Sequence, residues 1–471
     1  MVTLRADLCV VGGGPAAQAL AAGAVRMGAR AVVLAGEGGA RQDHDGPLLA
    51  ALVAAGKAVQ ARRRPCFGLQ AQDQAADHAG IVDCLRAAID RAERCESLED
   101  LGVRVIPARG RFTGLAEMQA GDHLIRARRF VIATDTGLAL PSLPGLEAVP
   151  FLTSATLPAL CKRPGHLLIL GAGRSGVAIA QACRRLGSRV TLIDSGQALN
   201  GEDPQAVALV TRALRNDGVE VIERARPEQV GGRPGAIELR VAGGTVFIGT
   251  HLLLATGRRP DLTGLGLDAA GIKHGPDGIE TDARLRSTNR RVFAIDAATI
   301  RQRGFPLDHQ VQVVLRAALL GLPVWLRDHR ITRVIHADPA LAQAGLAEAK
   351  ARARHGAALR VITLPLGGND ANRASAGDEP ASGFIKLIAH RDRLVGVTIA
   401  APDAERMIDL WVLILAQGTR LSALLAPTGK VLPNLPGATL IKRALDPYFS
   451  PAVFDNTLVK RVIGLVQRVL P

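Results

Sequence analysis

Cysteine is scarce in this chain, and its six cysteines are not grouped. No two of them have the C-x-x-C spacing of zinc or iron–sulfur sites, which argues against a metal centre. Cys9 and Cys183 fall in apolar strand or helix patterns and are predicted core residues. Because nothing indicates a disulfide framework, a cytoplasmic protein is expected.

Aromatic residues make up only 3% of the sequence, so Leu, Val, Ile and Ala must fill the cores. The shortage of aromatic rings argues against a protein that stacks on single-stranded nucleic acid. No apolar run of the sequence reaches the ~18–20 residues that span a bilayer. The first strand is predicted almost directly after Met1, so no signal peptide is expected.

Acidic residues are outnumbered, with 43 against 58 basic ones and a net charge of +15. A field of this sign attracts nucleic acid, anionic lipid or an acidic protein. The plainer interpretation, an Arg-rich background whose charges are solvated, is favoured. Nucleic acid is disfavoured as a partner because aromatic residues are few.

Two glycine-rich turns indicate dinucleotide-binding folds. The first, Gly12-Gly13-Gly14-Pro15-Ala16-Ala17, follows an apolar strand and opens an Ala-rich helix. The second is Gly171-Ala172-Gly173-Arg174-Ser175-Gly176, again between a predicted strand and a helix. One such motif is weak evidence, but two of them together with Ala255-Thr256-Gly257-Arg258-Arg259-Pro260 are strong. Tandem folds of this kind suggest a flavin that exchanges electrons with a nicotinamide.

The order of these pieces resembles the flavoprotein pyridine nucleotide-disulfide oxidoreductases, which include mercuric reductase and dihydrolipoamide dehydrogenase. The likeness covers nearly the whole chain and includes residues 96–103, 151–157 and 185–191. It implies an α/β fold with two Rossmann-like dinucleotide-binding domains and a C-terminal α+β dimerisation domain. The predicted domains are residues 1–150 with 280–328 for FAD, 151–279 for NAD and 329–471 for dimerisation.

Hydrophobic periodicity predicts the main elements outside the two turns. Helices are expected at residues 81–92, 204–217 and 309–320, and strands at 103–106, 130–133, 219–222, 359–364, 383–389 and 394–399.

The second turn has the features of a nicotinamide site. Gly171 allows the tight turn, Gly173 lets the backbone approach the pyrophosphate, and Gly176 lets helix pack on strand. Asp194 ends the next strand, where a carboxylate binds the ribose, and no Arg follows it directly, so NADH is favoured over NADPH. The alternative is a retained motif that binds nothing. The predicted NAD-binding residues are Gly171, Gly173, Arg174, Ser175, Gly176, Asp194 and Gly257.

The first turn keeps its glycines but departs from the family around them. The resemblance places a ribose-binding Glu at Ala35, and Glu37 replaces it only if the loop bends back. It places a ribityl-binding Asp at Ala297, or at Asp296 if one residue is deleted. The family's Ala-Thr-Gly is Ala133-Thr134-Asp135 here, which adds a carboxylate near the flavin. Weak FAD binding is expected, through Gly12, Gly14, Pro15, Ala17, Glu37, Ala133 and Asp296.

The residues for dithiol chemistry are missing. The resemblance places the redox thiols near Arg41 and Gly46, yet no cysteine lies between Cys9 and Cys66. The family's Lys–Glu pair beside the flavin and its C-terminal His–Glu base are replaced by Leu49, Ala178, Leu432 and Thr439.

Two other features have both a functional and a plain interpretation. Asp43 and His44 form a candidate acid–base pair, but a polar loop is favoured. Residues 458–470 predict an amphipathic helix with a basic face, which suits peripheral contact with an anionic membrane. Packing of this helix within a dimer is the favoured alternative.

The sequence leaves three hypotheses of function. The first is an FAD-dependent NAD(P)H oxidoreductase that passes electrons directly from flavin to a small acceptor such as a quinone. The second is a catalytically inactive paralogue that serves as a structural, regulatory or NADH-sensing subunit. The third, which has least support, is a basic scaffold recruited to membrane or nucleic acid. A homodimer, or a heterodimer with an active paralogue, is expected, and the catalytic residues stay unassigned.

Overall fold

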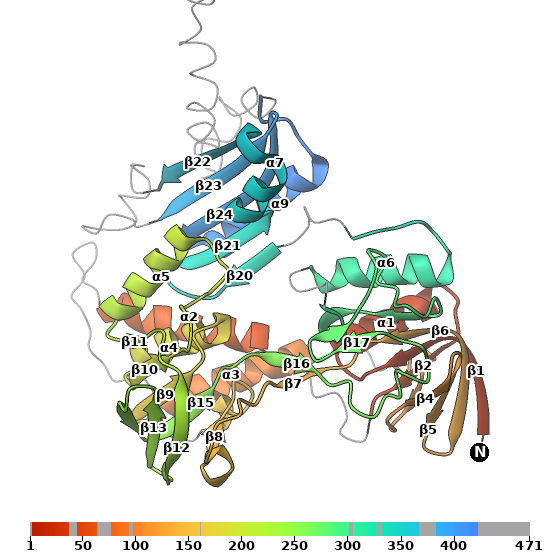
Figure 1. The fold of residues 1–471 in the computed structure, drawn as a ribbon, viewed down its shortest axis with the longest axis horizontal. Coiled ribbons are helices and arrows are strands. Elements are labelled where there is room, and N and C mark those ends of the chain that lie inside the picture. The colour runs from red at the N-terminus through yellow and green to blue at the C-terminus, as the bar shows by residue number, and fades with distance from the viewer. Residues whose placement is uncertain are drawn as a thin grey trace, which may run out of the picture. The chain divides into compact units, whose positions relative to one another are not determined.

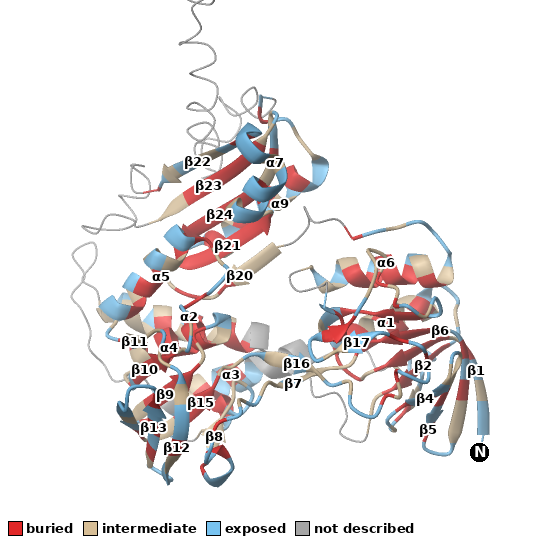
Figure 2. Cartoon of the chain, in the orientation of Figure 1, coloured by how far each residue is buried: buried red, intermediate tan, exposed pale blue. Residues whose placement is uncertain are grey.

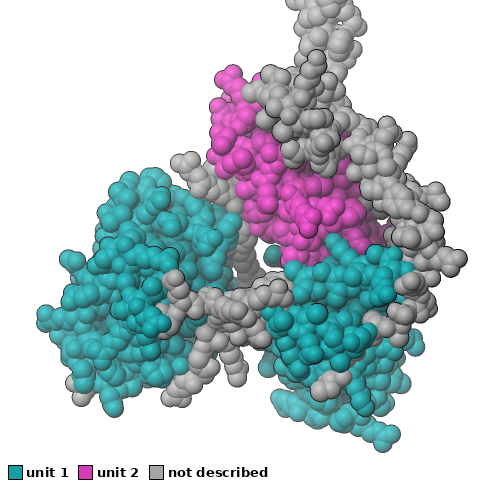
Figure 3. Space-filling view, turned by 180° about the vertical axis from the view of Figure 1, so that it is seen from behind, with its two compact units in different colours: residues 1–64, 71–200, 214–327 teal, residues 65–70, 201–213, 328–471 magenta. Residues whose placement is uncertain are grey.

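The computed structural model describes residues 2–36, 45–63, 77–93, 98–160, 162–300, 305–326, 332–366 and 383–422. The chain divides into two compact units, which Figure 3 colours separately. Unit 1 contains residues 1–64, 71–200 and 214–327, and unit 2 contains residues 65–70, 201–213 and 328–471. Both glycine-rich turns therefore lie in unit 1.

The first nucleotide fold of unit 1 is built on a seven-stranded sheet in the order β3-β2-β1-β6-β5-β4, with β19 also on β6 (Figure 1). Its central strands pair in parallel, and β4, β5 and β6 form an antiparallel meander. The strands are β1 (Val2–Val11), β2 (Ala31–Leu34), β3 (Arg104–Ile106), β4 (Arg111–Gly114), β5 (Glu117–Ala120), β6 (His123–Ile132) and β19 (Val292–Ala294).

Both faces of this sheet are covered, which explains why β1 is apolar on successive residues. Leu8 and Val10 pack with helices α1 (Pro15–Arg26) and α6 (Leu307–Leu319). Cys9 packs on the other face, in a cluster with residues of the meander. The parallel strands thus point their carboxyl ends at one edge, where the first glycine-rich turn lies.

The second nucleotide fold has a five-stranded parallel sheet in the order β11-β10-β9-β15-β8. Beside it lies an antiparallel sheet of β12, β13 and β14. The elements are β8 (Phe151–Leu152), β9 (His166–Leu170), α4 (Arg174–Arg185), β10 (Arg189–Ile193), β11 (Glu220–Ile222), β12 (Pro227–Arg233), β13 (Ala236–Val241), β14 (Val246–Gly249) and β15 (His251–Leu254). Helix α5 (Pro204–Asn216) lies between β10 and β11 in the sequence, and its residues 204–213 belong to unit 2.

Several short elements and two long helices complete unit 1. An antiparallel ribbon pairs the chain segments that leave the two folds. These elements are the ribbon strands β7 (Thr136–Leu138) and β16 (Arg258–Pro260), β17 (His274–Gly275), β18 (Gly278–Ile279), the 3₁₀ turns η1 (Leu146–Ala148), η2 (Leu157–Ala159) and η3 (Asp296–Ala298), and helices α2 (Asp45–Arg63) and α3 (His78–Glu93).

Unit 2 contains a five-stranded antiparallel sheet in the order β20-β21-β24-β23-β22. Figure 2 shows that its central strands are mostly buried, and residues of α9 pack in the same core. Its elements are β20 (Thr332–Ile335), β21 (Ala340–Gly345), α7 (Glu348–His355), η6 (Gly356–Ala358), β22 (Leu359–Pro365), β23 (Phe384–His390), β24 (Arg393–Ala401) and α9 (Ala404–Gln417).

A buried ion network ties parts of unit 2 together. The Lys386 ammonium donates to Asp203 at 2.6 Å and to Glu348 at 3.0 Å. Asp203 also accepts the N–H groups of Gln205 and Ala206 at the start of α5. One carboxylate therefore caps a helix and neutralises a buried cation.

The predicted architecture of two nucleotide folds and a C-terminal α+β domain is confirmed. Within the described part of the chain, no helix combines the length and apolar character needed to cross a membrane.

Candidate functional site

Both glycine-rich turns have the same backbone geometry. Gly12 has a φ of 132° and Gly171 a φ of 108°, where an L side chain is strained. An added Cβ at Gly12 would overlap the carbonyl oxygen of Ala133, and one at Gly171 that of Ala255. The protein's own packing therefore requires these two glycines.

Backbone hydrogen bonds align the ends of β2 in the first fold and β10 in the second. The first glycine of each turn donates its N–H to the last residue of that strand, at 2.9 Å to Leu34 O and 2.8 Å to Ile193 O. Ala35 and Asp194 follow these residues and so occupy equivalent places. The first fold thus has alanine where the second has its candidate ribose ligand. Glu37, the other candidate in the first fold, lies outside the described residues.

The residues that follow β6 in the first fold and β15 in the second are also equivalent. Ala133 donates its N–H to Val11 O at the end of β1, and Ala255 donates its N–H to Leu170 O at the end of β9, both at 2.8 Å. Asp135 and Gly257 lie two residues further on. Gly257 has a φ of 96°, and an added Cβ there would have no neighbour within 4 Å. The first fold therefore carries a carboxylate at the position where the second has an open glycine.

Asp194 is held by the turn beside it. Its Oδ2 accepts the N–H of Ala172 at 2.6 Å, and its Oδ1 accepts the N–H of Gly196 at 2.7 Å. A carboxylate oxygen has more than one lone pair, so both oxygens can still accept ribose hydroxyl groups. This arrangement fits the predicted role of Asp194.

The start of α4 offers an anion site at the second turn. Gly173 is the N-cap residue, is exposed, and has no neighbour within 4 Å of an added Cβ. An added Cβ at Gly176 would overlap Gly171 O, so this glycine serves close packing. Arg174 is exposed and Ser175 half-buried in the first helical turn. The N–H groups of such a turn bind phosphate oxygens well.

Arg224 lies beside this site and was not among the residues predicted from the sequence. Arg224 donates its N–H to Gly196 O at 2.8 Å, which places it beside the loop that follows Asp194. The residues directly after Asp194 in the sequence, Ser195, Gly196 and Gln197, offer no positive charge to a 2′-phosphate. A basic residue just after the next strand, β11, is the signal that would have identified it.

The first turn differs in what lies in front of its second glycine. An added Cβ at Gly14 would overlap Oδ1 of Asp135 and lie 3.1 Å from its carboxyl carbon. Gly14 is buried, whereas the equivalent Gly173 is exposed. The neighbouring Pro15 is exposed at the first position of α1, and Ala17 is fully buried.

The threonines after the two exit strands also differ. Thr256 Oγ1 donates to Ala139 O at 2.7 Å. The equivalent Thr134 Oγ1 is buried and has no hydrogen-bond partner among the described residues. A buried hydroxyl without a partner is costly, and a bound group at this edge would supply one.

Asp296 lies at the same edge of the first sheet, because β19 pairs in parallel with β6. It is exposed, has a φ of 53°, and its N–H donates to Gln310 Oε1 at 2.8 Å. The structure thus brings Asp296 to the edge that holds Gly12 and Ala133.

The two positions that the resemblance assigns to a Lys–Glu pair are apolar and buried. Leu49 in α2 is 6% exposed and Ala178 in α4 is 0% exposed. Helices α2 and α4 pack closely, since an added Cβ at Gly56 would lie 3.2 Å from Ala182 Cα. A charge returned to either position alone would be buried without its partner.

The thiols of the described residues do not replace a redox pair. Burial raises the pKa of Cys9 to about 12 and that of Cys183 to about 12. Both are core residues, as predicted, and neither forms the reactive thiolate at neutral pH. Cys84 is free and exposed. Asp43, His44, Leu432 and Thr439 lie outside the described residues.

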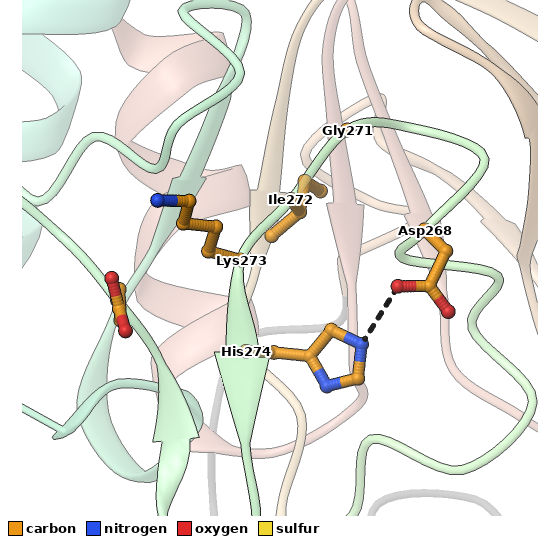
Figure 4. Close-up of a pocket in the computed structure, with 6 residues that line it drawn as sticks. Asp268, Gly271, Ile272, Lys273 and His274 are labelled. Carbon is orange, nitrogen blue, oxygen red and sulfur yellow. Dashed lines mark ion pairs between the residues drawn. The ribbon is translucent and has the colours of Figure 1, made fainter.

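An open hollow in unit 1 contains none of the predicted site residues (Figure 4). Within it, His274 Nε2 lies 3.4 Å from Asp268 Oδ1, and the Asp268 side chain is 96% exposed. Lys273 points away from this pair. Such a solvated pair indicates no catalytic role.

Comparison with known families identifies the family to which these two nucleotide folds belong. Residues 6–318 match the family described as pyridine nucleotide-disulphide oxidoreductase. The chain belongs to that family. Residues 331–439 match its dimerisation domain, which confirms the predicted C-terminal domain type and indicates a homodimer. Members of this family bind FAD and NAD(P)H, and its characterised relatives are flavoproteins.

Mercuric reductases are among the relatives. That of Streptomyces lividans is 32% identical over 425 residues, which cover 85% of this chain and 88% of the relative. That of Bacillus cereus is 30% identical over 359 residues, which cover 74% of this chain but only 56% of the longer relative. The fold resembles that of the Cu(II) complex of the HOCl-induced flavoprotein disulfide reductase RclA from Escherichia coli. The TM-score is 0.77 at 20% identity, over 94% of this chain and 99% of RclA.

The two folds fit their cofactors unequally. In the second, the open Gly173, the start of α4 and Asp194 suit NAD(H). In the first, the backbone turn suits a dinucleotide, but the Asp135 side chain stands against Gly14.

Proposed function

We propose that the protein is an NADH-dependent flavoprotein oxidoreductase without dithiol chemistry, in which flavin passes electrons directly to a small acceptor such as a quinone. The observation that carries the proposal is the second turn, where Asp194 and the open Gly173 flank the exposed start of α4. FAD, when bound, would take two electrons from NADH as a hydride and pass them on to the acceptor.

The residues of the second fold have separate tasks. Gly173 lets the pyrophosphate approach the backbone, and the N–H groups of Arg174 and Ser175 hold its oxygens. Asp194 accepts the ribose hydroxyls and disfavours the 2′-phosphate of NADPH. Together they orient the nicotinamide for reaction.

The buried residues Leu48, Leu49 and Ala178 support an apolar acceptor. A flat, apolar molecule such as a quinone suits an apolar wall better than a charged disulfide does. We therefore expect no turnover of lipoamide, glutathione disulfide or mercuric ion, because the sequence has no cysteine near Arg41 and Gly46, where the resemblance places the redox thiols.

The second candidate function is a catalytically inactive paralogue that acts as a structural, regulatory or NADH-sensing subunit. The favouring observation is Asp135 against Gly14, together with Ala35 in place of a ribose acid. Such a subunit would bind NADH on the second fold and form a heterodimer with a complete paralogue through the same surface that forms the homodimer.

Assembly is proposed through residues 329–471. A two-fold homodimer at micromolar concentration is expected in sedimentation, and a stable monomer would count against it. We also propose a cytoplasmic protein that contacts a membrane peripherally through the amphipathic helix predicted at residues 458–470, which lie outside the described residues.

The purified protein tests the enzyme directly. Its absorption spectrum is recorded for flavin at about 450 nm, a general property of the oxidised ring. The protein, supplied with FAD if necessary, is then titrated anaerobically with NADH and reoxidised with a series of quinones. Bleaching by NADH and recovery with quinone support the proposal. Bound flavin that resists NADH would overturn it, and a protein that cannot be reconstituted with FAD would favour the inactive paralogue.

A further inference from the structure

The space in front of Gly14 is where a dinucleotide would meet the first turn. The second glycine of this motif exists so that pyrophosphate can approach the backbone. Gly14 and Gly173 have nearly identical dihedral angles, with φ −74° and −73° and ψ −177° and −172°. Their missing Cβ atoms therefore point into equivalent spaces. At Gly173 that space is empty of protein within 4 Å, and at Gly14 it holds the Asp135 carboxylate.

The backbone around Asp135 is fixed on both sides. Ala133 donates its N–H to Val11 O at 2.8 Å, and Asp261 donates its N–H to Asp135 O at 3.1 Å. Thr136 then enters the β7–β16 ribbon, where Arg258 Nε donates to its Oγ1 at 2.6 Å. The carboxylate can leave the space only by rotation of its own side chain.

Charge opposes a dinucleotide as well as position. The start of α1 attracts an anion, as the start of any helix does, and the Asp135 carboxylate is such an anion. A pyrophosphate that arrives at Gly14 must displace this carboxylate and then tolerate a like charge nearby. Rotation of a half-exposed side chain makes displacement feasible at a cost in affinity.

We propose that Asp135 is a built-in competitor of the dinucleotide in the first fold and sets a weak affinity for flavin. This inference rests on the proposed assignment of the first fold as the flavin site. It names the residue responsible, because the equivalent Gly257 leaves the second fold open.

The test measures FAD affinity of the flavin-free full chain by equilibrium dialysis. Asp135→Gly removes both the bulk and the charge, and Asp135→Asn keeps the bulk and removes the charge. Asp135→Gly should tighten FAD binding by about 10- to 100-fold, the range of a charged hydrogen bond, and Asp135→Asn by a smaller factor. Asp268→Asn makes the same charge change on an exposed carboxylate and should leave FAD affinity unchanged.

NADH binding to each variant checks that unit 1 is folded, since the second fold is untouched. Unchanged FAD affinity in Asp135→Gly, or no FAD binding in any variant, would overturn the inference. Tighter FAD binding in Asp135→Gly but not in Asp135→Asn would still support the inference and would assign the effect to the bulk of the side chain, not to its charge. Tighter FAD binding without reduction by NADH would support this inference while the proposed enzyme fails. Unchanged FAD affinity in Asp135→Gly, with full reduction of the flavin by NADH, would overturn this inference and support the proposed enzyme.

Discussion

The two nucleotide folds share a backbone and differ in the side chains around it. Gly12 and Gly171 are both required by contacts inside the protein. Asp194 and Gly257, which the sequence assigns to the NAD site of the second fold, correspond to Ala35 and Asp135 in the first. Steric demands of the fold preserve a turn whether or not it binds, so the glycines alone are weak evidence of a cofactor. The acid and the open space beside them are the informative features.

The largest expected effect is on the stability of unit 2, and it should leave both glycine-rich turns unaffected. Lys386→Met would leave the buried Asp203 carboxylate without its cation and Glu348 with Arg352 alone, and it should cost about 3–5 kcal/mol of unfolding free energy. Denaturant unfolding measures it, with affinity for NADH unaltered in the folded protein. The double variant with Asp203→Asn should recover part of the loss. A cost below about 1 kcal/mol, the value of a surface pair, would contradict the buried network.

Blocking the second turn should make it resemble the first. Gly173→Val places a side chain where the protein has no neighbour within 4 Å, so the fold should survive. NADH affinity should fall at least 100-fold, about 2.7 kcal/mol, because the pyrophosphate can no longer approach. Calorimetry measures it against Gly114→Val, another glycine with an open neighbourhood. Equal NADH binding by both variants would show that NADH does not use this turn.

Removal of the ribose acid sharpens the contrast between Asp194 and Ala35. Asp194→Ala should weaken NADH by about 1.5–3 kcal/mol, the value of a charged hydrogen bond. NADPH should lose less, because its 2′-phosphate gains relief from a like charge and Arg224 stays nearby. Binding of both nucleotides to both proteins is compared, and a similar loss for each would remove Asp194 as the selecting residue.

The smallest effect concerns pH and unit 2. Desolvation by burial raises the pKa of Glu348, but the hydrogen bonds and charges of Lys386 and Arg352 together outweigh it and hold the pKa below its ordinary value of 4.5. Its contribution to stability is therefore present above pH 4.5 and is lost as the pH falls through the lower folded pKa. Glu348→Gln should flatten this acid limb in unfolding measured from pH 6 to about pH 3. An unchanged slope would mean that Glu348 is not coupled to folding.

Much of the fold was predictable because strong periodicity marks its elements. The helix expected at 204–217 is Pro204–Asn216, and the strand expected at 383–389 is Phe384–His390. The sheet of β12, β13 and β14 was missed, since β12 contains Gly231 and Gly232 and its residues are mostly exposed. Local pattern does not reveal strands of this kind, which form by pairing with neighbours.

The sequence named most residues of the candidate site, but it did not reveal their contacts. The sequence identified Asp135 as an added carboxylate near the flavin. Its position against Gly14 depends on the parallel pairing of β1 with β6, which joins residues more than a hundred positions apart. The place of Arg224 beside Gly196 likewise follows from the pairing of β10 with β11.

Binding of NADH and FAD to the flavin-free wild-type chain, measured separately by calorimetry, tests the central contrast most directly. We expect NADH to bind at one site per chain and FAD to bind more weakly than NADH. FAD that stays bound through dialysis, combined with no binding of NADH, would contradict it.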